Sequence, residues 1–135
     1  MSVHESIAVW IDREPTREEE ISALEDEDIF EMANLGEKQT GIPGVVFIST
    51  VMGSHGPRVK YYLRTGPAQP SFSVAVASQP RVLANSMDDR DMNRMAPLVL
   101  EWVRLNHEAL ASFWWEGKFW LDEDVAAFKA ALVKV

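Results

Sequence analysis

The chain contains no cysteine and only three histidines among its 135 residues. The absence of cysteine excludes disulfide bonds and thiolate chemistry, so zinc could be bound only by histidines and carboxylates. The histidines, His4, His55 and His107, are far apart in the sequence. The sequence also lacks a phosphate-binding loop and a dinucleotide-binding fingerprint. We therefore expect no metal site and no cofactor.

Long hydrophobic runs are also missing. No segment approaches the roughly eighteen consecutive apolar residues that a membrane span requires, and the first residues show no basic leader followed by an apolar stretch. A chain of this length can nevertheless bury a core of its own. We expect one domain, residues 1–135, located in the cytoplasm and without a membrane partner.

Basic residues are scarce in the first third of the chain. Residues 1–37 contain twelve acidic residues against Arg13 and Arg17, so this segment has a net charge of −10. Because the whole chain has a net charge of −8, residues 38–135 have a net charge of +2. The whole protein should be repelled by nucleic acid and anionic membranes, whereas residues 38–135 alone would be close to neutral or slightly basic.

The acidic segment, residues 1–37, reads as a strand followed by helix. Ser6–Asp12 has the β-branched and aromatic content of a strand. Thr16 begins a capping box, and Met32 and Leu35 fit one face of a helix that Gly36 would end. Residues 37–44 have the composition of a linker.

The middle of the chain predicts strands joined by short turns. A nearly continuous apolar run covers 44–52, an alternating pattern covers 58–64, and shorter apolar stretches cover 71–78 and 81–85. Such short connections favour an antiparallel meander.

The last part of the chain predicts helices. Apolar residues at helical spacing support a long helix over 88–116, with Asp88 near its start and Gly117 as its C-terminal cap. A second amphipathic helix is predicted over 122–134. The sequence therefore predicts an α+β domain in which a small antiparallel sheet of three to five strands packs on the long helix 88–116. The sheet and this helix together cover 44–116, and further helices flank them.

No catalytic constellation is visible. The loop Gly53-Ser54-His55-Gly56-Pro57 places a hydroxyl beside an imidazole, but it lacks the spacing of a nucleophile elbow, and an adjacent Ser-His pair seldom makes a productive hydrogen bond. We interpret the loop as a turn. We expect that the protein is not an enzyme.

One predicted strand face alternates cations with an aromatic residue. Arg58, Lys60, Tyr62 and Arg64 share this face. Alternate cations can follow phosphates while the aromatic ring stacks on a base. The other interpretation is an exposed sheet face whose charges protect an edge. Nucleic-acid or phosphate-ligand binding through these residues is the alternative hypothesis.

Aromatic residues crowd the end of the long helix. Phe113, Trp114, Trp115, Phe119 and Trp120 cannot all lie on one side of the helix end, so some should remain accessible. Tryptophan is strongly enriched among the residues that dominate interface energetics. We predict a partner-binding surface at Trp114, Trp115, Phe119 and Trp120, and core packing for the rest.

Three stretches form a recognisable pattern of strand, loop and helix: Gly44-Val45-Val46-Phe47, then His55-Gly56-Pro57, then Val99-Leu100-Glu101-Trp102-Val103-Arg104-Leu105 with Leu110 and Trp114. This pattern resembles a family of small uncharacterised bacterial domains that occur in toxin–antitoxin-like two-gene arrangements. The first stretch is similar to the family's first strand, the second to a shortened form of its loop, and the third to its helix.

The resemblance covers about residues 44–115 and departs from the family at its histidines. Arg58 and Lys60 stand where the family's strand has two histidines, and Asn106 stands where its helix has one. The resemblance therefore implies the fold more than an activity. The leading hypothesis is a cytoplasmic protein-interaction module that acts through the aromatic end and the acidic segment, and the resemblance implies that it is one member of a toxin–antitoxin-like pair. A homo-oligomer is also compatible with such a surface.

Overall fold

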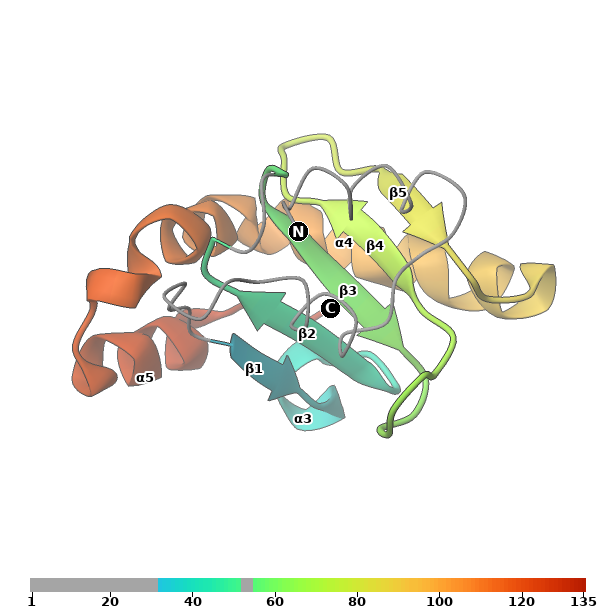
Figure 1. Ribbon diagram of the computed structural model, residues 1–135, viewed down its shortest axis with the longest axis horizontal. Helices are drawn as coiled ribbons and strands as arrows, with labels where there is room; N and C mark the ends of the chain where they lie inside the picture. Colours follow the sequence, from blue (N-terminus) through green and yellow to red (C-terminus); the bar gives the residue numbers. More distant parts are fainter. Residues whose placement is uncertain (1–31, 52–54) are drawn as a thin grey trace, which may run out of the picture.

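The computed structural model describes residues 32–51 and 55–135, which form an α+β fold. Five strands make one antiparallel sheet in the order β1-β2-β3-β4-β5, so each strand pairs with its neighbour in the sequence (Figure 1). The strands and helices have the following bounds: β1 Met32–Leu35, β2 Val45–Ser49, β3 Arg58–Tyr62, β4 Phe72–Ala75, β5 Val82–Asn85, α3 Glu37–Thr40, α4 Asp89–Glu116, η1 Gly117–Phe119 and α5 Asp122–Ala131. The predicted fold class is confirmed.

The long helix α4 begins and ends close to where its sequence signals place it. The Asp88 side chain accepts a hydrogen bond of 2.8 Å from the backbone N–H of Asp91, which satisfies one free donor of the first turn. Pro97 lies within the helix and is exposed. Gly117 caps the C-terminus. A Cβ at Gly117 would lie 2.6 Å from the Phe113 ring, so the close packing of the chain there requires glycine.

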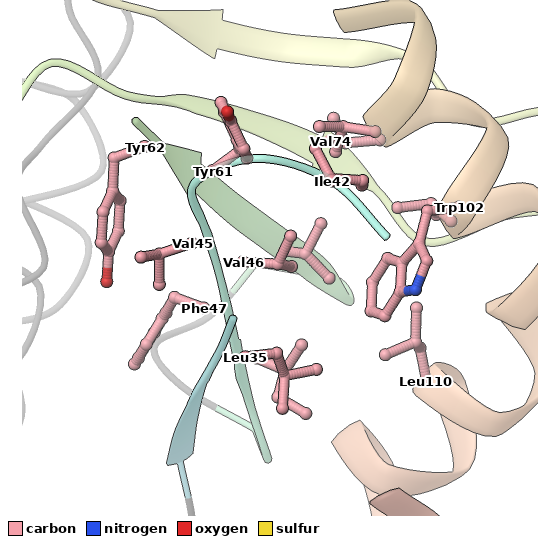
Figure 2. Close-up of a cluster of buried hydrophobic side chains, with 14 of the residues drawn as sticks. Leu35, Ile42, Val45, Val46, Phe47, Tyr61, Tyr62, Val74, Trp102 and Leu110 are labelled. Atoms are coloured by element: carbon pink, nitrogen blue, oxygen red, sulfur yellow. The ribbon is translucent and has the colours of Figure 1, made fainter. Parts of the chain in front are cut away.

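The core lies between the sheet and α4. Figure 2 shows Val46, Leu35 and Val74 on the side of the sheet that faces Trp102 and Leu110 of α4. The indole of Trp102 is fully buried, as are Val99 and Val103 on the same helix face. Val45, Phe47 and Tyr62 point to the opposite side of the sheet in Figure 2, and they are buried too. The middle of the sheet is therefore buried on both faces.

Two predictions for the ends of this fold are wrong. Met32–Leu35 forms the edge strand β1 rather than the end of a helix, because it pairs with β2 in the register Leu35↔Val46. Hydrogen bonding between strands outweighs the weak helix preference of such a short segment. Residues 37–44, interpreted as a linker from their composition, contain the short helix α3. The predicted strand Ser6–Asp12 and the helix beginning at Thr16 lie outside the described residues.

The predicted helix 122–134 is also too long at its C-terminus. Helix α5 ends at Ala131, and the chain continues in an extended conformation toward α3, where the Val135 N–H donates to the Thr40 carbonyl oxygen at 3.0 Å. The buried side chain of Asn106 binds this segment from α4: its Nδ2 donates to the Val133 carbonyl at 2.9 Å, and its Oδ1 accepts from the Val133 N–H at 2.7 Å. This pairing replaces the hydrogen bonds of a further helical turn.

We expect Asn106→Ala to lower the free energy of unfolding by about 2 kcal/mol, because both backbone polar groups of Val133 lose their partner. The Val133 side chain is half exposed, so water can replace part of the loss. Chemical denaturation measures the change. The matched control is Asn93→Ala, an exposed position on the same helix, where the change should stay within about 0.5 kcal/mol. Equal effects of the two substitutions would contradict this role for Asn106.

Candidate functional site

The aromatic residues at the end of α4 are buried or exposed according to the side of the helix on which they lie. Phe113 and Trp114 follow Leu110 by three and four residues, so all three lie on the buried side of α4. Each is at most 3% exposed. Trp115 is rotated by a further 100° or so and lies in solvent, with 55% of its surface exposed. The prediction that Trp114 belongs to a contact surface is therefore wrong, because its indole is inside the core.

Three apolar side chains stand out in solvent where the chain turns from α4 into α5. Trp115 is the last exposed aromatic residue of α4, Phe119 ends η1 with 77% exposure, and Leu121 precedes α5 with 63%. In Figure 1 this turn forms one end of the molecule, away from the sheet. We call Trp115, Phe119, Trp120 and Leu121 the aromatic corner. Sequence reasoning missed Leu121, which occupies the N-cap position of α5, where polar residues are preferred.

Trp120 connects the aromatic corner to the core and is partly exposed. Its ring lies 5.8 Å from the Phe128 ring, edge to face at 62°, and 6.0 Å from the Phe113 ring. Phe113 and Phe128 stack at 4.7 Å. Beside Trp120 lies a shallow hollow of about 580 Å³, lined also by Asp124, Ala127 and Phe128. Of the rings of the corner, Trp120 is thus held in place by Phe113 and Phe128, and the hollow leaves room for side chains of another molecule.

The basic strand face is not an exposed surface. Arg58, Lys60 and Tyr62 lie on β3 with the predicted alternation, but Lys60 is only 2% exposed and Tyr62 only 5%. The Tyr62 hydroxyl donates to the Asn34 side-chain oxygen at 2.6 Å, which ties β3 to β1 across β2. The prediction that this face presents cations to phosphates is therefore wrong for Lys60 and Tyr62.

The two arginines of that set, Arg58 and Arg64, differ in exposure, and the residues between them, Lys60 and Tyr62, are buried. Arg58 is partly buried, and both Arg58 and Lys60 already have interaction partners. Arg64 lies beyond the end of β3 and is exposed. It borders a hollow of about 260 Å³ together with Gln69 and Asp91. The structure therefore leaves Arg64 as a single exposed cation of the predicted set, too little for a phosphate-tracking strand.

His55 is packed against the core rather than displayed in an open loop. Its ring lies 5.5 Å from the ring of Trp114, and its Nδ1 donates to the Gly56 carbonyl oxygen at 3.1 Å. Burial lowers the pKa of His55 to about 4, and the nearby charge of Arg58 acts in the same direction. A neutral, packed imidazole contributes to the fold. Gly53 and Ser54 of the same loop lie outside the described residues.

Metal binding, His107 and membrane-spanning helices are the remaining points on which the sequence made predictions. In residues 32–51 and 55–135, no group of three or more His, Asp or Glu residues could hold a metal ion. On α4, the His107 Nδ1 donates to the Arg104 carbonyl oxygen at 2.9 Å. No helix in the described part of the chain is both long and apolar enough to cross a membrane.

Comparisons with protein-family models, with curated proteins and with solved structures found no match for this chain. The resemblance to the toxin–antitoxin-like family therefore stays a prediction.

Proposed function

We propose that this protein is a protein-interaction module that binds a partner through the aromatic corner. The observation that carries the proposal is the exposure of Trp115, Phe119 and Leu121 at one turn of the chain, where each has more than half of its surface in solvent. Large aromatic side chains supply much of the energy of protein interfaces when a partner covers them.

The packing of Trp120 also favours a binding role. Its ring, which belongs to the corner, contacts Phe113 and Phe128, and these two rings stack on each other in the core. A firmly supported ring loses little conformational freedom when a partner covers it, so more of the contact energy appears as affinity. Elsewhere on α4 the exposed apolar side chains, Leu98 and Leu105, stand seven residues apart and are about 40% exposed. Scattered aliphatic residues of this kind are ordinary on protein surfaces.

In the cell, we propose a cytoplasmic role as one member of a toxin–antitoxin-like pair, in line with the family resemblance of residues 44–115. The predicted surface changes from the sequence hypothesis in two residues: Trp114 is removed because it is buried, and Leu121 is added. Binding of nucleic acid through the strand face receives no support, since Lys60 and Tyr62 are buried.

The test compares a double variant, Trp115→Ser with Phe119→Ser, against the wild-type chain purified from its source organism. We expect one near-stoichiometric partner to co-purify with the wild type and to decrease by about tenfold or more in the variant, because two exposed hot-spot residues are lost. Quantitative mass spectrometry measures the partner, and sedimentation velocity measures self-association. Melting curves should stay close to wild type, since both side chains are exposed.

The matched control is Leu98→Ser with Leu105→Ser, which removes two exposed apolar side chains from α4 away from the corner. This control should keep the partner. Retention of the partner by the Trp115 and Phe119 variant, together with its loss in the control, would place the binding surface on α4 and reject the aromatic corner.

A further inference from the structure

Acidic side chains surround the aromatic corner. Glu116 ends α4, and Asp122, Glu123 and Asp124 occupy the first turn of α5, all of them exposed. Lys118 and Lys129 are the basic residues of the same stretch, 116–131. The acids in the first turn of α5 suit the positive end of the helix dipole. They also give the apolar surface a negative rim.

We propose that the partner segment bound by the aromatic corner is a cationic peptide segment of another protein, with arginine or lysine side chains next to apolar ones. This inference rests on the function proposed above and specifies the chemistry of the partner. Its apolar side chains would cover Trp115, Phe119 and Leu121, while its cations meet the rim. Charge complementarity of this kind favours encounter and excludes wrong partners.

The hollow beside Trp120 has the chemistry to receive one such cation. Trp120 and Phe128 form two aromatic walls at 62° to each other, and Asp124 lines the same hollow. Aromatic ring faces attract ammonium and guanidinium groups. One Asp124 oxygen accepts from the Leu121 N–H at 3.1 Å, and a carboxylate has further lone pairs for a guanidinium donor.

The corner already binds a cation of its own. The Lys118 ammonium lies 5.2 Å from the centroid of the Phe119 ring, which is the geometry of a cation–π contact. An exposed ring near several carboxylates is therefore a favourable place for an ammonium group in this protein. Lys118 lies against Phe119, whereas no basic residue of the described part of the chain lines the hollow between Trp120, Asp124 and Phe128.

The same rim disfavours the other candidate occupants. A symmetric dimer of this chain would bring each acidic rim close to its own copy, because an isologous interface uses the same patch twice. Each chain also carries a net charge of −8. Nucleic acids and anionic lipid surfaces are repelled for the same electrostatic reason.

The test selects random twelve-residue peptides displayed on phage against the immobilised full chain at low ionic strength, where charge attraction is least screened. We expect the enriched peptides to carry an excess of arginine and lysine adjacent to leucine, phenylalanine or tryptophan. The affinity of the most enriched peptide should fall about tenfold in the double variant Glu123→Gln with Asp124→Asn. The asparagine oxygen can still accept from the Leu121 N–H, so the start of α5 is preserved.

The matched control is Asp89→Asn with Glu101→Gln, which also removes one aspartate and one glutamate charge, but from exposed positions on α4 far from the corner. It should leave the affinity within about twofold of the wild type. Enrichment of neutral or acidic peptides, no enrichment at all, or an affinity that the Glu123 and Asp124 variant leaves unchanged would overturn the inference.

The same peptides, tested on the Trp115→Ser and Phe119→Ser variant, distinguish a failure of the cationic preference from a failure of the proposed function. Neutral apolar peptides that lose binding with Trp115→Ser and Phe119→Ser would keep the aromatic corner as a binding surface and reject its preference for cations. Cationic peptides that bind this variant as tightly as the wild type would reject the corner itself.

Discussion

Replacing Trp102 by alanine should lower the free energy of unfolding by about 4 kcal/mol, the largest effect of a single substitution that we expect in this protein. Trp102 is 0% exposed and lies where α4 meets the sheet, beside Leu110 and Val46 in Figure 2. Truncation would leave a cavity at the centre of the core, because the neighbouring strand and helix backbones cannot close over it. Chemical denaturation monitored by circular dichroism measures the loss.

A milder substitution tests whether packing alone explains the effect. The Trp102 Nε1 is buried and finds no hydrogen-bond partner within the described residues. Trp102→Phe keeps most of the apolar contact and removes this unpaired donor, so we expect a loss of no more than about 1.5 kcal/mol. Trp115→Ala is the control: it removes an exposed indole from the same helix and should cost less than about 0.5 kcal/mol. A similar loss for the Trp102 and Trp115 alanine variants would contradict the assignment of Trp102 to the core.

The sequence predicted α4 almost residue by residue because its signals agree with one another. Apolar residues recur at helical spacing, Asp88 provides a side-chain cap, and Gly117 follows the last turn. The edge strand β1 was not predicted, because a segment of four residues without β-branched side chains has little preference of its own. Its pairing with β2 determines its conformation.

For the aromatic corner, the sequence predicted the place in the chain and three of the residues, but it wrongly included Trp114 and missed Leu121. The direction of Trp114 could have been derived from its distance of four residues from Leu110, which places both on one helix face. The burial of Lys60 could not be derived from β3 alone, because alternation separates the two faces of a strand and says nothing about what covers them. A signal existed on the neighbouring strand: β2 is a continuous apolar run, Phe47 pairs with Lys60, and both residues are buried.

The pH dependence of stability should contain a contribution from His55 in the acid range. Burial beside Trp114 and the charge of Arg58 lower its pKa in the folded protein to about 4, from an ordinary value of 6.5. The unfolded chain therefore binds a proton at His55 between pH 6.5 and 4 while the folded protein does not. Stability from this residue is complete above pH 6.5 and is lost as the pH falls toward 4.

We expect this contribution to reach about 2 kcal/mol or more between pH 7.5 and pH 4.5, because pH 4.5 lies about two units below the pKa of histidine in the unfolded chain. Urea denaturation of the wild type and of His55→Gln at the two pH values isolates it from the carboxylates, which titrate in both proteins. The variant should lose less stability than the wild type by that amount, although it is less stable at pH 7.5, where the ring contact with Trp114 is missing. His107→Gln, on the more exposed face of α4, controls for the loss of a histidine as such. Parallel pH profiles for the wild type and His55→Gln would show that the imidazole is accessible to protons in the folded protein, and the packed position of His55 would then have to be rejected.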